Sequence, residues 1–236
     1  MPKHFFKFKQ FVIQQDKCAM KVGTDGTLLG AWADVTRCKK VLDIGTGTGL
    51  IALMIAQRNK EASVDAIEID VDAHKQAAEN FTNSPFSKQI RIYHTSLQSY
   101  AQKTIEVSYD LILSNPPYFS DSLKCPEKKR SLARHNDTLP LNELIYFSSL
   151  LLTANGRISL ILPFQKIDEL INLANQNKLY AIRQTNIIPT LGKQPKRTLV
   201  EFSFQKSSFC IEELVLEHSR NQRTDAYQKL TQEFYL

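Results

Sequence analysis

Cysteine is scarce in this sequence of 236 residues, and no apolar stretch is long enough to cross a membrane. The four cysteines form no CxxC pair, and no histidine stands at the spacing of a zinc site; they are Cys18, Cys38, Cys125 and Cys210. This pattern argues against a disulfide framework and a structural zinc site, so we expect no metal and a reducing, cytoplasmic environment. Lysines are interspersed in the first eleven residues, MPKHFFKFKQF, so we expect neither a signal peptide nor a membrane span.

Glycine and proline are also infrequent, with 8 and 9 residues, and the chain has no internal repeat or low-complexity segment. Charged residues at 23% argue against a disordered or fibrous chain, and 42% hydrophobic residues suffice for the core of one domain.

The basic residues are unevenly distributed. The whole chain carries 30 Lys and Arg against 24 Asp and Glu, whereas residues 41–118 carry 6 basic and 9 acidic side chains. The basic excess therefore lies in the N-terminal arm, around 124–134 and around 193–197. Basic segments on both sides of a slightly acidic block favour a polyanionic partner such as a nucleic acid.

Strand-like and helix-like patterns alternate from residue 39 onward. Strands are predicted at 40–45, 63–69, 89–94, 109–115, 156–163, 180–189 and 198–206. Helices are predicted at 49–58, 72–81, 141–153 and 165–177. Repeated β-α units indicate an α/β, Rossmann-like, mostly parallel seven-stranded sheet with helices on both faces. The last two strands follow each other without a helix, so we expect the last strand to be antiparallel.

Two regions lie outside this pattern. Residues 1–38 precede the first core strand and are predicted to form an arm or small hairpin that packs on a domain of residues 39–236. Residues 119–138 form a polar insertion after the fourth strand.

A glycine-rich turn follows the first core strand, in the sequence VLDIGTGTG. Asp43 ends the strand, and Gly45, Gly47 and Gly49 occupy alternate positions around Thr46 before a helix begins. Small residues let the backbone approach a ligand closely at this edge of a sheet. The GxGxG pattern differs from the dinucleotide fingerprint GxGxxG and resembles motif I of S-adenosylmethionine enzymes, in which Asp43 would lie beside the ammonium group of the cofactor.

The end of the second strand carries Glu68, which lies 19 residues after Gly49. An acid at this place accepts hydrogen bonds from both hydroxyls of a ribose. Asp70 and Asp72 are competitors, although Asp72 fits better as the cap of the next helix. At the end of the third strand, Ser96 stands where an acid usually binds the adenine of the cofactor, so adenine recognition stays open between Ser96 and a backbone amide.

The fourth strand is followed by Asn115, Pro116, Pro117 and Tyr118. A ring-bound amine is a poor nucleophile because its lone pair is delocalised into the ring. The side-chain oxygen of Asn115 and the carbonyl of Pro116 can each accept one N–H of such an amine, which holds its lone pair on line with a methyl donor. Tyr118 offers a stacking face for a flipped base. The motif alone leaves adenine N6, guanine N2 and a glutamine amide as acceptors.

The segments FKFKQFVIQQDKCAMKVGTDGTLLGAWA, VLDIGTGTGLIALMIAQR and SNPPYF together resemble the bacterial tRNA1(Val) adenine-N6 methyltransferase family. The resemblance implies a class I methyltransferase fold, S-adenosylmethionine as cofactor and methylation of adenine 37, next to the valine anticodon. It also implies that Lys21 and Thr24, with Asp25 and Gly26, close the methionine end of the cofactor. The alternative is that the glycines only make turns and that Asp25 caps a helix beginning near Thr27.

We expect the anticodon stem-loop of a tRNA to bind around the mouth of this site, on a monomeric protein. The candidate RNA-binding residues are one aromatic and seven basic side chains: Phe119, Lys128, Lys129, Arg130, Arg134, Lys193, Lys196 and Arg197. An ordinary solvated surface is nearly as good an interpretation for any one of the basic residues.

Other functions remain to be weighed. Glutamine methyltransferases of release factors share NPPY but carry a helical domain before motif I, where this chain has only 40 residues. DNA adenine methyltransferases have a target-recognition domain larger than the insertion at 119–138. A ribosomal-RNA methyltransferase is the nearest enzyme alternative. A non-catalytic RNA-binding module is a further one, although Asp43, Glu68 and Asn115 are all present.

Overall fold

The computed structural model describes residues 4–104, 108–117 and 139–236. The strands are β1 (Phe5–Lys7), β2 (Val12–Gln14), β3 (Lys40–Ile44), β4 (Ser63–Glu68), β5 (Ile90–His94), β6 (Tyr109–Ser114), β7 (Leu152–Pro163), β8 (Tyr180–Thr190), β9 (Arg197–Ser203), β10 (Cys210–Ser219) and β11 (Gln222–Arg223). The helices are α1 (Thr24–Trp32), α2 (Leu50–Arg58), α3 (Val71–Thr82), α4 (Leu97–Lys103), α6 (Leu141–Leu151), α7 (Ile167–Gln176) and α8 (Asp225–Thr231), with a 3-10 turn η1 (Phe164–Lys166) before α7.

Nine of the described strands build one large sheet in the order β11-β10-β8-β9-β7-β6-β3-β4-β5, and β1 and β2 form a separate pair. Strands β5, β4, β3, β6 and β7 are mutually parallel, and β9 inserts antiparallel between β7 and β8. The seven predicted strands, including the antiparallel last one, are therefore confirmed. Strand β10 pairs parallel to β8, and β11 pairs with β10; these two strands extend the sheet beyond the prediction.

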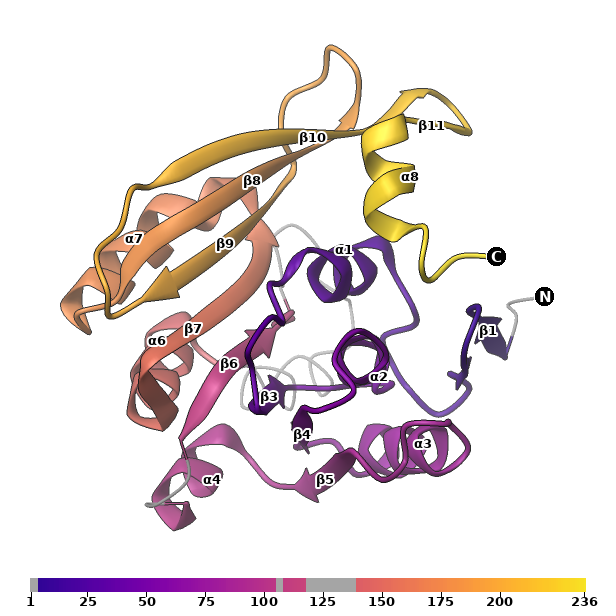
Figure 1. Ribbon diagram of the computed structural model, residues 1–236, viewed down its shortest axis with the longest axis vertical. Helices are drawn as coiled ribbons and strands as arrows, with labels where there is room; N and C mark the ends of the chain where they lie inside the picture. Colours follow the sequence, from indigo (N-terminus) through magenta and orange to yellow (C-terminus); the bar gives the residue numbers. More distant parts are fainter. Residues whose placement is uncertain (1–3, 105–107, 118–138) are drawn as a thin grey trace, which may run out of the picture.

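Helices cover both faces of the sheet (Figure 1). Helices α1, α2 and α3 lie on one face, and α4, α6 and α7 lie on the other. The two faces have separate apolar cores because side chains alternate along each strand. On β3, Val41 points into the core beneath α1 and α2, whereas Leu42 and Ile44 point into the core beneath α4, α6 and α7. Every predicted helix is present within a few residues of its predicted bounds.

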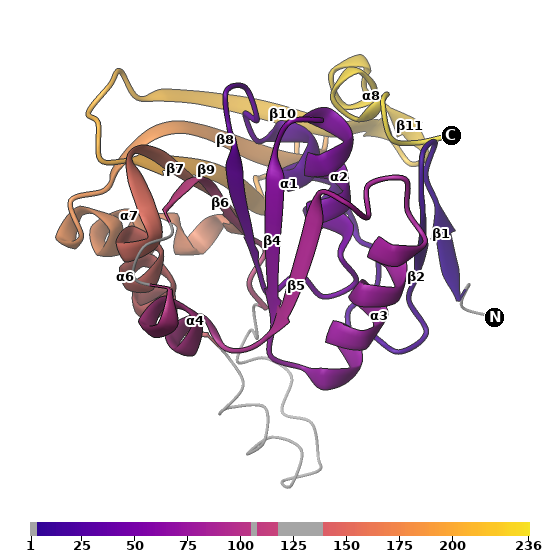
Figure 2. The ribbon, with the colours of Figure 1, turned by 60° about the horizontal axis from the view of Figure 1, so that its bottom comes forward.

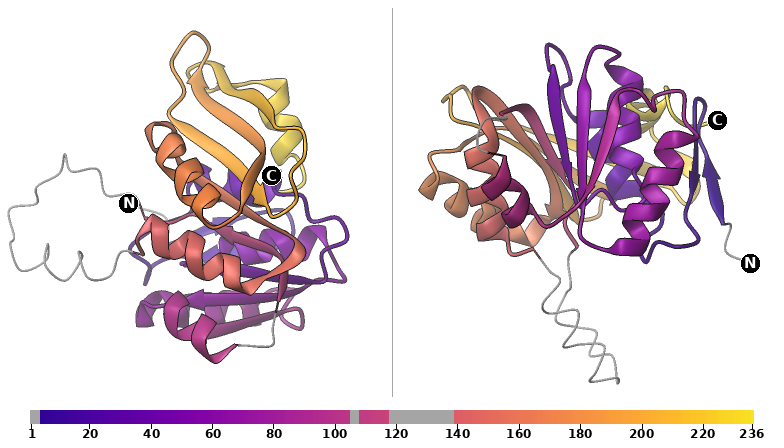
Figure 3. Two further views of the ribbon diagram at one scale, coloured as in Figure 1. Left: turned by 90° about the vertical axis from the view of Figure 1, so that its left-hand side faces the viewer. Right: turned by 90° about the horizontal axis from the view of Figure 1, so that it is seen from below.

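The N-terminal arm contains a two-stranded antiparallel hairpin, β1 and β2. Phe8, Phe11 and Ile13 are buried and join the core that contains α1 and α2. The two ends of the described chain lie on the same side of the molecule, with the hairpin near α8 (Figures 1 and 3). Helix α1 falls inside the segment predicted as an arm, and the division of the chain at residue 38 stays a prediction.

Two glycines let α1 pack closely on α2. A Cβ on Gly30 would lie 2.8 Å from Sδ of Met54, and a Cβ on Gly26 would lie 3.2 Å from Cδ2 of Leu50. Leu50 is the first residue of α2, directly after the glycine-rich turn. Gly26 therefore brings the first turn of α1 against the start of α2. Figure 2 shows the α1–α2 pair beside the parallel strands.

No helix among the described residues is both long and apolar enough to span a bilayer.

Candidate active site

The glycine-rich turn links β3 to α2 in a left-handed backbone conformation. The φ angles of Gly45, Gly47 and Gly49 are +68°, +56° and +84°, which disfavours any residue with a side chain. A Cβ on Gly49 would also lie 2.4 Å from the ring of Phe81, whereas a Cβ on Gly45 or Gly47 would meet no atom within 4 Å. The outer part of the turn thus leaves its backbone open to a ligand, and its inner part is packed against α3.

Asp43, at the carboxyl end of β3, is fully buried behind this turn. Its Oδ2 accepts hydrogen bonds from Oγ1 of Thr46 at 2.6 Å and from the amide of Ala52 at 3.2 Å. Its Oδ1 is buried without a hydrogen-bond partner, and burial raises the pKa of the carboxyl group to about 7. This acceptor lacks a hydrogen-bond donor, and a donor with a positive charge, such as the predicted ammonium of the cofactor, would satisfy it and favour the ionised carboxylate.

Glu68, at the carboxyl end of β4, faces the glycine-rich turn. Its Oε2 accepts the amide N–H of Gly47 at 2.8 Å, and its Oε1 accepts those of Ile69 and Asp70, each at 2.9 Å. An ionised carboxylate has about four acceptor positions, so three are in use and one is open. A ribose bound through two hydroxyls would have to replace the Gly47 amide at Oε2.

The cap of α3 differs from the prediction. Asp70, rather than Asp72, is the N-cap residue, and its side chain accepts the amides of Asp72 and Ala73. The predicted cap at Asp72 was therefore wrong. The helix begins at Val71, one residue before its predicted start, and its N-cap is Asp70. Asp70 is thus committed to the helix, which leaves Glu68 as the acid that faces the turn.

Ser96 begins α4 and caps it. Its hydroxyl accepts the amide of Ser99 at 3.2 Å. The preceding residue, Thr95, donates its amide to the carbonyl of Glu68 at 3.0 Å, so the ends of β4 and β5 lie together. Ser96 is close in the fold to the other candidate cofactor residues, but its hydroxyl already has a structural partner.

The start of the NPPY segment lies beside the glycine-rich turn. In the parallel pair of β3 and β6, Ser114 is the register partner of Ile44, and its Oγ donates to the carbonyl of Ile44 at 2.9 Å. Asn115 and the glycine-rich turn therefore leave neighbouring strands at the same edge of the sheet. Asn115 is half-buried, Pro116 is buried and Pro117 is exposed. Tyr118, Phe119, Lys128, Lys129, Arg130 and Arg134 lie outside the described residues.

The KVGTDG segment precedes and opens α1. Gly23 is the N-cap residue, and no side chain caps this helix, so Asp25 does not cap it and the helix begins before Thr27. Asp25 instead accepts a hydrogen bond from Nε of Arg197 at 2.8 Å. Lys21 is exposed, and Thr24 is the first helical residue.

The three basic residues predicted in the β8–β9 connection have different surroundings. Lys193 and Lys196 are exposed, whereas Arg197 is half-buried and paired with Asp25. The connection leaves β8 and enters β9 next to Pro163, at the carboxyl end of β7. It therefore lies at the same edge of the sheet as Asn115.

Asn80 is a residue that the sequence did not single out. It is buried on α3, donates to the carbonyls of Gln14 and Thr48, and accepts the amide of Gln14. One side chain thus joins the arm to the glycine-rich turn. The only signal in the sequence was that Asn80 is a polar residue on the apolar side of α3, four positions after Gln76. The side chain of Gln76 likewise contacts the arm, because its Oε1 accepts the amide N–H of Lys17.

Comparisons with known proteins identify the family. The Methyltransferase small domain family matches residues 19–135. A tRNA1(Val) (adenine(37)-N6)-methyltransferase from Bacteroides fragilis is 50% identical over 236 residues, which cover 100% of this chain and 99% of the relative. A protein of the same name from Haemophilus influenzae is 46% identical over 232 residues, with 98% of each chain covered.

Solved structures share the fold at low identity. The crystal structure of a predicted O-methyltransferase from Agrobacterium tumefaciens superposes with a TM-score of 0.71, at 20% identity, over 89% of this chain and 96% of that one. A ribosomal protein L11 methylase from Lactobacillus delbrueckii gives a TM-score of 0.54 at 17% identity, with 77% of each chain covered. The fold is that of class I S-adenosylmethionine-dependent methyltransferases, and the full-length relatives show that the chain belongs to the tRNA1(Val) (adenine(37)-N6)-methyltransferase family.

Proposed function

We propose that this chain transfers a methyl group from S-adenosylmethionine to N6 of adenine 37 in tRNA1(Val), the reaction for which its relatives are named. The observation that carries the proposal is the position of Asn115 beside the glycine-rich turn, at the carboxyl ends of two hydrogen-bonded strands. A nucleophile held by Asn115 is thereby placed next to a cofactor held by the turn.

The described residues offer complementary groups for each part of this cofactor. The open backbone at Gly45 and Gly47 allows close approach, the unpaired Oδ1 of Asp43 suits an ammonium group, and the open acceptor position of Glu68 suits a ribose hydroxyl. We assign Thr46 to the same site through its bond to Asp43. Lys21 and Thr24 are proposed to close the site from the α1 side, because Gly26 holds α1 against the start of α2.

Asn115 and Pro116 are proposed to orient the adenine amine. The bound cofactor supplies a methyl group on a positively charged sulfur. Asn115 accepts one amine N–H through its side-chain oxygen and Pro116 accepts the other through its carbonyl, which directs the nitrogen lone pair toward that methyl group. The new nitrogen–carbon bond would form as the carbon–sulfur bond breaks and leaves a neutral thioether. The nitrogen would lose its proton to water afterwards, so no strong general base is required. Pro117 stiffens the segment, and Tyr118 is proposed to stack on the base.

The RNA is proposed to approach from the edge of the sheet that carries Asn115. Lys193 and Lys196 are exposed at that edge. We also assign RNA contacts to Phe119, Lys128, Lys129, Arg130 and Arg134. Arg197 stays a candidate, although its pair with Asp25 leaves it fewer N–H donors for RNA. We further propose that the protein acts in the cytoplasm as a monomer on the anticodon stem-loop.

Mass spectrometry of tRNA nucleosides tests the proposal. Total tRNA from cells that lack this protein is incubated with isotope-labelled methyl donor, digested, and assigned by nuclease mapping. We expect labelled N6-methyladenosine at position 37 of tRNA1(Val) and none with an Asn115→Ala variant. Label in guanine would contradict the assigned substrate, and so would an unlabelled tRNA pool when ribosomal RNA or a glutamine-containing protein substrate, incubated in parallel, becomes labelled.

A further inference from the structure

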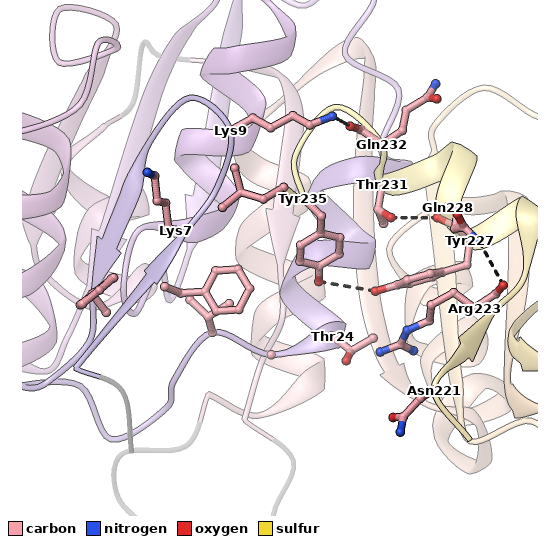
Figure 4. A pocket seen from close by; sticks show the side chains of 15 residues that line it. Lys7, Lys9, Thr24, Asn221, Arg223, Tyr227, Gln228, Thr231, Gln232 and Tyr235 are labelled. Atoms are coloured by element: carbon pink, nitrogen blue, oxygen red, sulfur yellow. Dashed lines mark hydrogen bonds between the residues drawn. The ribbon is translucent and has the colours of Figure 1, made fainter. Parts of the chain in front are cut away.

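A groove of about 1030 Å³ lies between the arm hairpin, the start of α1 and helix α8. Figure 4 shows Lys7 and Lys9 on the arm side of the groove, Arg223 and Asn221 on the β11 side, and Tyr235 between them. The groove combines segments from the two ends of the sequence, and neither Asn115 nor the glycine-rich turn lines it. Thr24, which is proposed above to close the cofactor site, also lines the groove, so the groove adjoins the candidate active site without containing Asn115 or the glycine-rich turn.

The charged side chains that line this groove are all basic. Lys7, Lys9 and Arg223 line it and are exposed, and no Asp or Glu side chain is among the described residues of its wall. Arg223 is partly neutralised, because it pairs with Glu217 at 3.2 Å; Nζ of Lys9 donates to the carbonyl of Gln232 at 2.5 Å. The carbonyl of Gln232 carries no charge, so this bond does not neutralise Lys9. The wall therefore favours an anionic ligand.

The arm holds these lysines in place through alternation. Phe6 and Phe8 point inward and pack on Tyr235, with ring centroids at 6.1 and 5.8 Å. The backbone amide of Lys9 donates to the carbonyl of Phe234 at 2.8 Å. In β1 successive residues point to opposite sides, so Phe6 packs inward while Lys7 is exposed; Phe8 and Lys9 follow the strand, where Phe8 is buried and Lys9 is exposed.

Uncharged groups complete the wall. The side chains of Asn221, Gln228 and Gln232 supply donors and acceptors, and the ring of Phe5 is 48% exposed. Amide side chains suit ribose hydroxyls, and an exposed ring suits an unpaired base. Cations, amides and an aromatic face together match an RNA strand better than a small inorganic anion.

The groove is connected to the edge of the sheet that carries the active site. The amide of Leu191, in the β8–β9 connection, donates to the carbonyl of Glu217 at 3.0 Å, and the side chain of Glu217 pairs with Arg223. On the other side, Thr24 lines the groove, and its neighbour Asp25 pairs with Arg197. The exposed lysines of the β8–β9 connection and the cations of the groove thus belong to adjoining parts of the surface.

We propose that this groove binds the ribose–phosphate backbone of the substrate tRNA, outside the nucleotide that is methylated. The identity of the RNA rests on the proposed function, whereas the groove itself rests on the geometry above. Lys7 and Lys9 contact phosphates from the arm, and Arg223 contacts them from β11.

The test compares tRNA binding by Lys7→Gln/Lys9→Gln, by Lys7→Arg/Lys9→Arg and by a control, Lys39→Gln/Lys40→Gln. The control lysines are exposed at the amino end of β3, the opposite edge of the sheet. Each neutralised phosphate contributes about 0.7 to 0.9 to the slope of log affinity against log salt. We expect the glutamine pair to lower the slope by about 1.4 to 1.8 and the affinity at low salt by about tenfold. The arginine pair and the control should bind like the parent.

Cofactor affinity and turnover at saturating tRNA serve as further readouts and should stay unchanged in all three variants. Parent-like affinity and slope in the glutamine pair would overturn the groove proposal. Equal weakening in the arginine and glutamine pairs would also overturn it, because it would show a packing defect instead of a lost charge. A failure of the proposed function is distinguishable, since the parent protein would then place no methyl group on adenine 37, whatever the variants bind.

Discussion

Arg197 Nε donates to Asp25 Oδ2 at 2.8 Å and thereby ties the start of β9 to the first turn of α1. Both side chains are only partly buried, with 37% and 31% of their surfaces exposed. Solvent screening limits such a pair to roughly 0.5 to 1 kcal/mol. The pair therefore adds little to stability and acts as a local link to the first turn of α1, while the packing of Gly26 and Gly30 on α2 holds the helix.

A double-mutant cycle with Arg197→Gln and Asp25→Asn measures this pair. We expect a coupling free energy of unfolding of roughly 0.5 to 1 kcal/mol in urea, and a small loss of cofactor affinity of the same size in both single variants, because each removes the same link to the first turn of α1. If Arg197→Gln alone weakened tRNA binding, with no effect of Asp25→Asn on the cofactor, Arg197 would act as an RNA ligand and not through α1.

Lys193 and Lys196 are exposed, whereas Arg197 is paired with Asp25. The charges of the two lysines can therefore be tested without disturbing that pair. Reversal of both to Glu should weaken binding of every tRNA, by about tenfold or more at low salt, because the loss concerns phosphate contacts. Cofactor affinity should not change. Binding of tRNA at parent strength in a filter assay would mean that the β8–β9 connection is only a solvated basic surface.

The order of strands and the residues at their ends could be predicted because both follow from local pattern. Gly45, Gly47 and Gly49 occupy left-handed positions, and Glu68 and Asn115 follow strands whose apolar runs were evident. The alternation of β-α units then places all of them at one edge of the sheet. For these residues, the sequence pattern alone was therefore enough to predict that they lie together at one edge of the sheet.

Contacts between distant segments could not be predicted. The bonds of Asn80 to Gln14 and Thr48 join three segments that no periodicity connects, and the same holds for Arg197 and Asp25. Strands β10 and β11 were missed because they extend an edge of the sheet, where one side of each strand is exposed and the apolar signal is weak. The groove between the arm and α8 depends on that extension.

The carboxylate of Glu68 gives a prediction with a matched control. Glu68→Ala should lower cofactor affinity by about tenfold or more, since hydrogen bonds to a charged acceptor are worth roughly 1.5 to 3 kcal/mol each. Asp70→Ala should leave that affinity nearly unchanged and lower only the stability, by about 1 kcal/mol, because Asp70 caps α3 and alanine cannot. Calorimetry that found the reverse order would move the ribose contact to Asp70.

Asp43 predicts a dependence of stability on pH. Burial raises its pKa to about 7, well above the ordinary value of about 3.9 in an unfolded chain. A raised pKa in the folded state means that its contribution to stability is complete below about pH 4 and is lost as the pH rises through about 7. The free energy of unfolding, compared with that of Asp43→Asn, should fall over this range. Parallel pH profiles for the two proteins would contradict it.

The same carboxyl group couples cofactor binding to protons. An ammonium beside Oδ1 of Asp43 lowers its pKa, so binding near pH 7 should release a proton. Calorimetry in two buffers of different ionisation enthalpy measures this release. The release should vanish in Asp43→Asn; its persistence there would assign the proton to another group.

Asn115 supports the most direct prediction about chemistry. Its side-chain oxygen is proposed to accept one N–H of the adenine amine, while its backbone continues β6 beside the glycine-rich turn. Asn115→Ala removes that acceptor and leaves Asp43, Glu68 and the turn in place, so cofactor affinity should change little. Turnover should fall by about a hundredfold or more, the usual cost of losing one positioned hydrogen-bonding group.

Asn115→Asp is the informative companion, because it retains an oxygen acceptor but adds charge, and it should keep more activity than the alanine variant. Single-turnover kinetics at saturating tRNA isolate the methyl-transfer step. If Asn115→Ala transferred methyl groups at the parent rate, another group would have to orient the amine, and the proposed mechanism would be wrong.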